Sequence, residues 1–179
     1  KSVIDIAYDI SEGLARAACA GEVNGEVVDL RTVLDSDCEL NILTAKDEKG
    51  LAVLRHTASH VLAQAVQTLY PEAKVAIGPS IDTGFYYDFA HEPFSREDLD
   101  AIEKEMKKIV KQSLPLEVFE VTKEKALDYM KERQEDYKVE MIEELPEGET
   151  ITFYKQGDYE EFCAGPHVSN TCVIKAIKL

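Results

Sequence analysis

The stretch that decides the fold is residues 51–70, LAVLRHTASHVLAQAVQTLY, which has the length and periodicity of one α-helix. His56 and His60 are four residues apart, so they share one face of that helix. The apolar residues gather roughly on the opposite face: Leu51, Leu54, Ala58, Val61, Leu62, Ala65 and Leu69. The pattern predicts a helix that packs with one face, presents two imidazoles with the other, and ends at Tyr70-Pro71.

A second pair with the same spacing, Cys163 and His167, lies in the segment EEFCAGPHVSN. The chain has four histidines, and only His91 falls outside the two pairs. Imidazole and thiolate are the ligands that zinc prefers, and four of them could close a tetrahedral site. Without a metal, a histidine can act as general base on water beside a hydrogen-bonding cysteine. We expect the two pairs to meet in one cleft; the alternative is that each histidine is an isolated surface or structural residue.

The composition is that of an ordinary globular protein. Of its 179 residues 45% are hydrophobic and 31% charged, with no apolar run near the ~20 residues of a membrane span and no leader-like opening. The four cysteines do not make a dense disulfide framework, and a chain of this length can bury its own core, so we expect them reduced and the protein cytoplasmic, with a disulfide as the alternative. The net charge of −15 argues against strong binding of nucleic-acid phosphates by this chain. We therefore expect any nucleic acid to be bound mainly by another module.

The first 46 residues predict a small α/β unit. A helix is expected over 3–10, a hairpin around Asn24-Gly25 and a strand over 38–44. These elements are too few to close a core, so we expect the natural module to begin upstream with a further hairpin. The charged segment 45–50, AKDEKG, is predicted to be a linker that separates domain 1–46 from domain 51–179.

Strands and helices mix without strict alternation after the histidine helix, so the predicted fold class is α+β with a mostly antiparallel sheet. Ser95, with Asp98 three residues later, is predicted to cap a helix, and Thr122 a further helix to about Arg133. The predicted strands are 74–88 (strand, turn, strand), 116–121, 138–142, 150–154 and 173–179. The GFYYDF run could stack a base or form a half-buried strand, and Lys138 could bind substrate or lie on the surface.

Three runs carry a resemblance to a known family: LRHTASHVLAQAVQTLYPEAKVAIGPSIDTGFYYDF, YKVEMI and FCAGPHVSNT. Together and in this order they resemble the amino-terminal editing region of bacterial-type threonyl-tRNA synthetases. The preceding 46 residues resemble the ubiquitin-like β-grasp module of the same family, without its first strands. Alanyl-tRNA editing domains are similar in the two His/Cys pairs, but not in the GFYYD and YKV runs or the leader.

The resemblance implies a proofreading hydrolase. A pocket built for threonine rejects serine, which lacks one methyl group, by only about 1–3 kcal/mol. A second site would hydrolyse the ester between serine and the terminal ribose of the tRNA for threonine. The implied partners are the terminal aminoacylated adenosine of tRNA and the remaining domains of a homodimeric parent enzyme, with no membrane. The resemblance implies that the aminoacylation core follows Leu179, so we expect no ATP binding by residues 1–179.

The resemblance also implies roles for particular residues. His56, His60, Cys163, His167 and Lys138 match catalytic positions, and Tyr87 and Glu161 match substrate-binding ones. Glu161 stands where relatives have aspartate, so its carboxylate reaches about one methylene further. The family's editing pocket works without a metal, so no cofactor is implied, and zinc held by the two His/Cys pairs is the alternative. The rival functions are a zinc-dependent alanyl-tRNA deacylase and a non-catalytic, zinc-stabilised interaction module.

Overall fold

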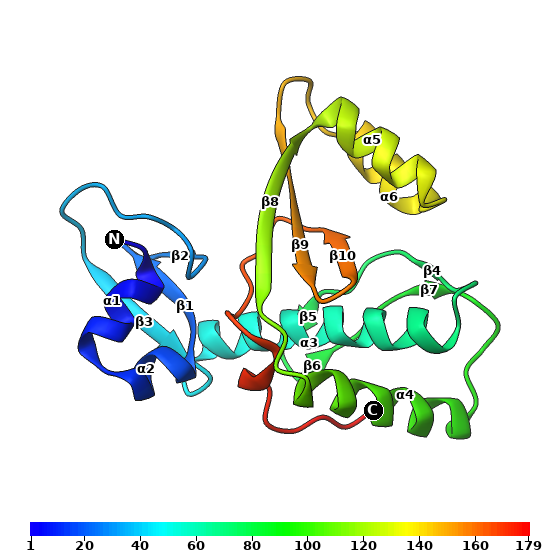
Figure 1. Cartoon of the computed structure of the whole chain (residues 1–179), viewed down its shortest axis with the longest axis horizontal. Helices are drawn as coiled ribbons and strands as arrows, with labels where there is room; N and C mark the ends of the chain where they lie inside the picture. Colours follow the sequence, from blue (N-terminus) through cyan, green and yellow to red (C-terminus); the bar gives the residue numbers. More distant parts are fainter.

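The helix α3 (Glu48–Leu69) forms the axis of the molecule in the computed structural model, which describes residues 1–179. Figure 1 shows an amino-terminal module at one end of α3, helix α4 (Arg96–Lys111) running along one side, and a three-stranded sheet on the other side. The helix contacts strands of the amino-terminal module as well as α4. Every strand pairing is antiparallel, and the predicted α+β class is confirmed. No helix has both the length and the apolar composition needed to cross a membrane.

The amino-terminal module contains two helices packed on a sheet of strand order β2-β1-β3. The predicted hairpin is confirmed: Asn24 (φ 49°) and Gly25 (φ 89°) both adopt the left-handed conformation that a tight two-residue turn requires. Val3, Ala18 and Leu30 form its small apolar core. Its elements are α1 (Val3–Ile10), α2 (Glu12–Ala17), β1 (Ala18–Val23), β2 (Glu26–Val28) and β3 (Leu40–Thr44).

The predicted linker over 45–50 is wrong in its second half, because α3 begins at Glu48. Asp47 is the N-cap residue, and its carboxylate accepts a 2.7 Å hydrogen bond from the amide of Thr44. Gly50 packs beneath the Thr44 carbonyl, where a Cβ atom would lie 2.1 Å from the oxygen. Acidic residues favour the first turn of a helix, so the charge of AKDEKG reflects a helix start rather than a flexible connection.

Helix α3 is also buried on more of its circumference than its periodicity predicts. His60 is only 2% exposed, and Thr57 and Ser59 are buried with it, whereas His56 is partly exposed. The division into a packing face and a presenting face therefore fails for His60, because other elements cover both sides of the helix. The main core forms where α3 meets α4, around Val61, Val66 and Met106. Ser95 and Asp98 form the predicted capping box of α4.

The predicted strand–turn–strand over 74–88 becomes four very short strands. The β5–β6 hairpin contacts α3, and β4 pairs with β7. The GFYYDF run enters β6 and β7, and it buries Tyr87 while Tyr86 stays exposed. These strands are β4 (Lys74–Val75), β5 (Ser80–Ile81), β6 (Gly84–Phe85) and β7 (Phe89–Ala90).

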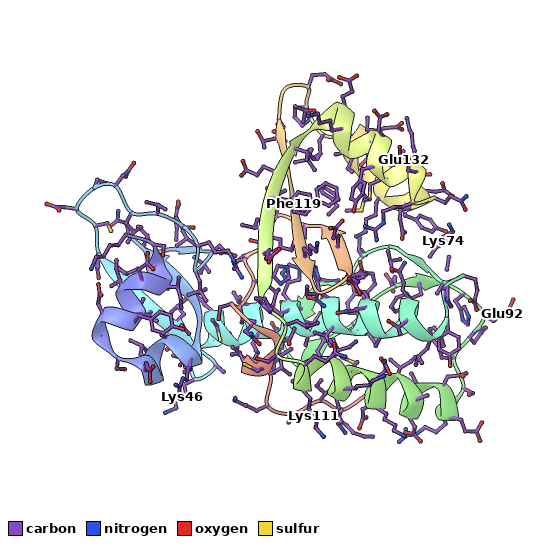
Figure 2. The ribbon with its side chains drawn as sticks, in the orientation of Figure 1. Lys46, Lys74, Glu92, Lys111, Phe119 and Glu132 are labelled. Atoms are coloured by element: carbon purple, nitrogen blue, oxygen red, sulfur yellow. The ribbon has the colours of Figure 1, made fainter.

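The larger sheet has the order β10-β9-β8 and is formed by β8 (Leu116–Thr122), β9 (Thr150–Gln156) and β10 (Tyr159–Phe162). Helix α5 (Lys123–Glu132) follows its Thr122 cap as predicted, and α6 (Asp136–Glu143) packs beside it. Figure 2 shows Phe119 on β8 turned toward these helices, where its ring stacks on that of Phe153. Strand β10 was not predicted, and it leads directly into the Cys163 loop.

Two predicted strands are wrong. Residues 138–142 lie in α6, because the buried residues Lys138 and Ile142 are four apart and so share one side of a helical turn. Residues 173–179 form no strand: a short 3₁₀ turn, η1 (Thr171–Val173), precedes an irregular end. Ile174 and Ile177 anchor that end in the main core, and their spacing of three does not fit the alternation of a strand.

Candidate functional site

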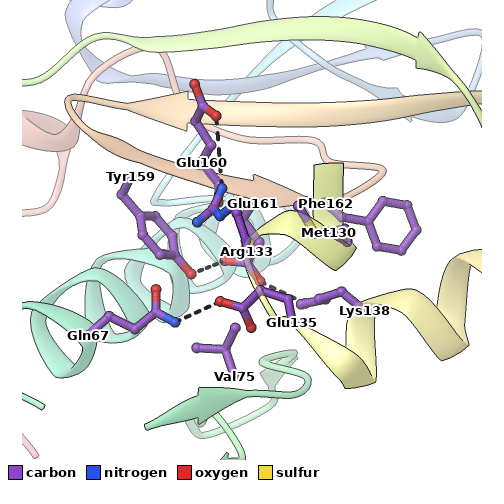
Figure 3. Close-up of a pocket in the computed structure, with 10 residues that line it drawn as sticks. All are labelled: Gln67, Val75, Met130, Arg133, Glu135, Lys138, Tyr159, Glu160, Glu161 and Phe162. Carbon is purple, nitrogen blue, oxygen red and sulfur yellow. Dashed lines mark hydrogen bonds and ion pairs between the residues drawn. The ribbon is translucent and has the colours of Figure 1, made fainter. Parts of the chain in front are cut away.

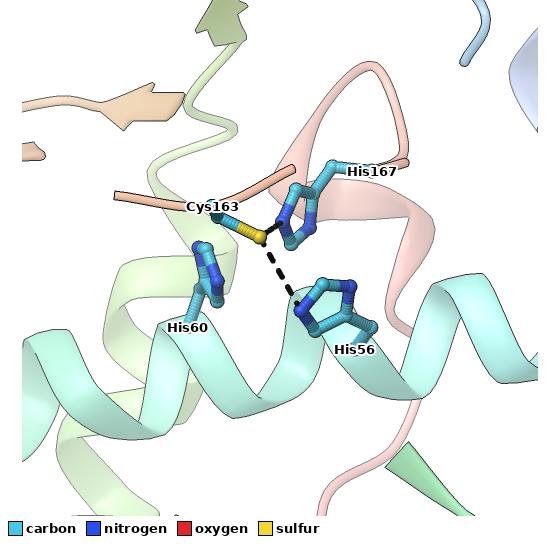
Figure 4. Close-up of side chains that lie close together, drawn as sticks. All are labelled: His56, His60, Cys163 and His167. Carbon is cyan, nitrogen blue, oxygen red and sulfur yellow. Dashed lines mark hydrogen bonds between the residues drawn. The ribbon is translucent and has the colours of Figure 1, made fainter. Parts of the chain in front are cut away.

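The two His/Cys pairs meet at one place. Figure 4 shows His56 and His60 on α3, facing Cys163 and His167 on the loop that follows β10. The Cys163 Sγ atom lies 3.5 Å from His56 Nε2 and 3.4 Å from His167 Nε2. One ligand-type atom from each of the four side chains lies within 4.8 Å of the others. Segments more than 100 residues apart thus form a single cluster, which we call the His/Cys cluster.

The loop conformation turns the cysteine toward α3. The amide of Cys163 donates to the carbonyl of Thr152 at 3.1 Å, which extends the β9–β10 pairing by one step. Gly165 then adopts φ +73°, and its amide lies 3.3 Å from the Cys163 sulfur. A Cβ atom at Gly165 would lie 2.2 Å from the Tyr154 hydroxyl. Glycine is therefore required there both by the backbone angle and by the space.

The orientation of the His167 ring is set from α3. Thr57 Oγ1 lies 3.0 Å from His167 Nδ1, accepts from the amide of Val168 at 3.2 Å, and can donate to the carbonyl of Val53 at 3.2 Å. When the hydroxyl proton goes to Val53, Oγ1 accepts the Nδ1 proton of His167. The Nε2 atom that faces Cys163 is then the unprotonated one, and it can accept a hydrogen bond from the thiol.

Glu161 is the centre of an adjoining buried network. Its Oε1 atom accepts from Lys138 Nζ at 3.1 Å and from the Tyr87 hydroxyl. Its Oε2 atom accepts from the Tyr159 hydroxyl at 2.9 Å and lies 3.5 Å from His60 Nε2. Lys138 is buried, so the alternative that it is a surface lysine is wrong. The structure thus brings Tyr87, Lys138 and Glu161 next to the His/Cys cluster.

Burial sets the protonation of these groups. It lowers the pKa of His60 to about 4, lowers the pKa of His167 well below the ordinary value, and lowers the pKa of His56 as well. It raises the pKa of the Cys163 thiol to about 12. Burial opposes ionisation of Glu161, but His60, Lys138 and the hydrogen bonds from Tyr87 and Lys138 hold its pKa below the usual range. At neutral pH the site therefore combines neutral imidazoles, a neutral thiol and an ionised carboxylate.

A cleft of about 340 Å³ opens beside the cluster, and its polar lining includes His56, His60, Lys138, Glu161 and Cys163. His167 is fully buried and does not line the cleft, so it contacts Cys163 from behind. Gly78 forms part of the wall, and its carbonyl accepts a 2.6 Å hydrogen bond from Ser59 on α3. A side chain at Gly78 would overlap the Tyr87 ring, since a Cβ atom would lie 2.0 Å from it.

Glu161 and Lys138 also line a second, much smaller cavity (Figure 3). Its volume is about 10 Å³, which is room for one water molecule. Glu135 lines it; one of its carboxylate oxygens accepts from Gln67 at 3.0 Å, and the other is buried with no protein partner.

The His/Cys cluster could also hold a metal ion. Three imidazoles and one thiol are a donor set that suits zinc, and separations of 3.4 and 3.5 Å from sulfur to nitrogen resemble the roughly 3.5 Å between ligands of a tetrahedral zinc ion. Binding would require the Cys163 thiol to lose its proton. His60 Nε2 faces Glu161, so this histidine would have to offer its other nitrogen or turn.

Several residues around the site were not predicted from the sequence. Thr57 and Tyr159 contact His167 and Glu161 directly, and Asp29 contacts the amide of His167. No spacing rule marks these residues, because each acts through a single contact made across the fold. The only hint of a role for Thr57 in the sequence is its place in the RHTASH run, beside His56.

Comparisons with known proteins show what the sequence is similar to. Residues 1–44 match the TGS domain, and residues 151–179 match the threonyl and alanyl tRNA synthetase second additional domain. Over 99% of its length the chain is 59% identical to a threonine–tRNA ligase of Acetivibrio thermocellus, 55% identical to that of Clostridioides difficile and 57% identical to that of Clostridium botulinum. It spans 28% of the length of each of these relatives. With both domains in this order, the chain corresponds in sequence to the amino-terminal region of bacterial threonine–tRNA ligases.

Proposed function

We propose that this chain carries out proofreading in a threonine–tRNA ligase, by hydrolysing the ester of serine attached in error to the tRNA for threonine. The observation that supports it best is the cleft of about 340 Å³ lined by His56, Cys163 and the Lys138–Glu161 pair. Small-molecule sites begin at about 300 Å³. A cleft of this size suits a small amino acid joined to part of a ribose.

The chemistry follows from the neutral imidazoles. The oxygen of a water molecule attacks the ester carbonyl carbon, and His56, which is partly exposed on the cleft, accepts the proton. The bond from that carbon to the ribose oxygen then breaks, and the proton passes to the ribose oxygen. Cys163 acts as a neutral hydrogen-bond donor rather than as a nucleophile, because its pKa of about 12 leaves little thiolate.

Substrate selection is assigned to the neighbouring network. Lys138 and Glu161 both line the cleft, whereas Tyr87 does not and acts through Glu161. The first sieve of the ligase separates threonine from serine by only about 1–3 kcal/mol. The second sieve would admit serine and exclude the extra methyl group of threonine.

The decisive experiment incubates the 179-residue chain with serine-charged and threonine-charged tRNA for threonine. We expect loss of serine only, and a decrease of about 100-fold or more in His56→Ala and Cys163→Ala. The matched controls are His91→Ala and Cys172→Ala, which change the same residue types away from the cleft and should retain the activity. Circular dichroism checks the fold of each variant. Equal loss of both amino acids, or of neither, contradicts the proposal.

A second candidate rests on the donor set of the His/Cys cluster. A zinc-dependent alanyl-tRNA deacylase would contain stoichiometric zinc, release alanine from charged tRNA and stop when the metal is removed. A non-catalytic zinc module would melt in a chelator and hydrolyse no charged tRNA. Metal analysis and alanine-charged tRNA therefore separate both from metal-free proofreading.

The proposed partners follow from this function. The terminal aminoacylated adenosine of tRNA would enter the cleft, while other domains of a homodimeric ligase in the cytoplasm hold the rest of the tRNA. A net charge of −15 fits that division, because phosphates would be bound mainly outside this chain. We also propose that residues 1–46 and 51–179 are separate domains.

A further inference from the structure

Two residues of the amino-terminal module reach the loop that carries Cys163 and His167. Asp29 and Arg31 follow β2, in the segment that the TGS domain match includes. Arg31 donates from Nη2 to the carbonyls of Leu116 and Val168 at 2.7 and 3.0 Å, and from Nε again to Leu116 at 3.2 Å. Its Nη1 atom donates to the carbonyl of His167 at 3.2 Å and to Asp29 at 2.9 Å. All five N–H groups of the guanidinium are thus used.

Asp29 binds the same loop from its other side. One carboxylate oxygen accepts from the amide of His167 at 3.1 Å and from the Tyr154 hydroxyl at 2.7 Å. The other oxygen accepts from the backbone and the side chain of Arg31, both at 2.9 Å. Burial raises the pKa of Asp29, but the neighbouring Arg31 outweighs this effect, so the carboxylate stays ionised. A charged pair therefore holds both backbone polar groups of His167.

These bonds bear directly on the His/Cys cluster. The backbone of His167 is held by Asp29 and Arg31, and its ring is held by Thr57 on α3. The remaining ring nitrogen, Nε2, meets the Cys163 sulfur at 3.4 Å. A shift of the His167 backbone would move this contact, and a displacement of about 1 Å in an active site can cost on the order of 100-fold in rate.

We propose that Asp29 and Arg31 are positioning residues, through which the amino-terminal module sets the geometry of the Cys163–His167 loop. Where it concerns turnover, this inference rests on the proposed function. Other contacts also hold the module at its boundary with the rest of the chain. An apolar cluster that includes Leu43, Val53 and Val168 joins the amino-terminal module to α3 and the loop. Glu22 of the module forms a separate 3.0 Å ion pair with Lys49 of α3.

The test compares Arg31→Met, Arg31→Lys and Asp29→Asn with Glu22→Gln, which removes an ion pair from the same boundary without touching the loop. The first readout is alkylation of Cys163 by iodoacetamide, located by mass spectrometry. In Arg31→Met and Asp29→Asn the thiol loses its fixed surroundings, so we expect alkylation about 10-fold faster than in the unchanged chain. Arg31→Lys keeps the charge and some donors and should fall in between, and Glu22→Gln should match the unchanged chain.

The second readout is deacylation of serine-charged tRNA. We expect kcat to fall about 10- to 100-fold in Arg31→Met with KM unchanged, and Arg31→Lys to recover part of the loss. Unchanged alkylation and unchanged kcat in the Arg31 and Asp29 variants overturn the inference, as does an equal effect of Glu22→Gln. If Arg31→Met shows no cooperative unfolding, it is not folded, and the alkylation rates and kcat of Arg31→Lys and Asp29→Asn then test the inference. If the unchanged chain releases no serine, the proposed function fails, while the alkylation rates still decide this inference.

Discussion

At the residue scale, the Thr57 hydroxyl links α3 to the Cys163–His167 loop through one buried oxygen. It contacts His167 Nδ1, the amide of Val168 and the carbonyl of Val53. Thr57→Val keeps the shape of the side chain but leaves the Val168 amide buried without a partner. Because an unsatisfied buried donor costs about 1–3 kcal/mol, we expect that decrease in the free energy of unfolding, measured by urea denaturation.

Thr68→Val is the matched control for this prediction. Thr68 lies on the same helix and its hydroxyl donates to the carbonyl of Gln64 at 2.8 Å, but the residue is exposed and contacts no loop. Water replaces a lost bond at such a site, so we expect a change within about 0.5 kcal/mol. Equal effects at both positions would show that the contact with the loop contributes nothing.

At the scale of elements, the Cys163–His167 loop depends on Gly165. This residue has φ +73°, and a Cβ atom there would overlap the Tyr154 hydroxyl. Gly165→Ala should therefore add the cost of overpacking, about 1–3 kcal/mol, to the cost of the backbone angle. It should also accelerate alkylation of Cys163, because relieving the overlap moves the loop.

Gly148→Ala separates the two costs. Gly148 has φ +83°, but a Cβ atom there would meet nothing within 4 Å. We expect this variant to show only the backbone cost, about 1 kcal/mol, and to leave the alkylation of Cys163 unchanged. Thermal and urea unfolding measure the difference, and a Gly165→Ala variant no less stable than Gly148→Ala would contradict the assignment.

At the scale of the whole molecule, buried neutral histidines make stability depend on pH. His60 has a pKa of about 4 when folded and about 6.5 when unfolded, so the unfolded chain binds a proton that the folded chain does not. Stability is therefore full above about pH 6.5 and falls as the pH drops toward 4. For His60 the loss between pH 7 and 5.5 is about 1 kcal/mol, and the lowered pKa values of His167 and His56 act in the same direction.

Urea unfolding at pH 7.0 and 5.5, in buffer with a chelator, measures this effect. His60→Gln has no titrating group at this position. Between pH 7.0 and 5.5 its free energy of unfolding should therefore fall by about 1 kcal/mol less than that of the unchanged chain. An unchanged pH dependence in His60→Gln would contradict the burial of its neutral ring.

Local pattern predicted the elements whose causes are local. The capping box at Ser95, the Asn24-Gly25 hairpin and the stop of α3 at Tyr70 each depend on a few neighbouring residues, and each was predicted correctly. The strand expected over 138–142 failed because β-branched and apolar residues in a short run fit either a strand or a helix. Packing against α5 decides between them.

The sequence by itself determined that two His/Cys pairs of equal spacing exist, and that each pair shares a short segment. Only the tertiary structure decided that they meet, since the distance from α3 to the loop after β10 depends on how the β10-β9-β8 sheet packs on α3. It also decided that Asp29 and Arg31 bind that loop. Periodicity and capping act over a few residues, whereas contacts between positions more than 100 residues apart exist only once the chain has folded.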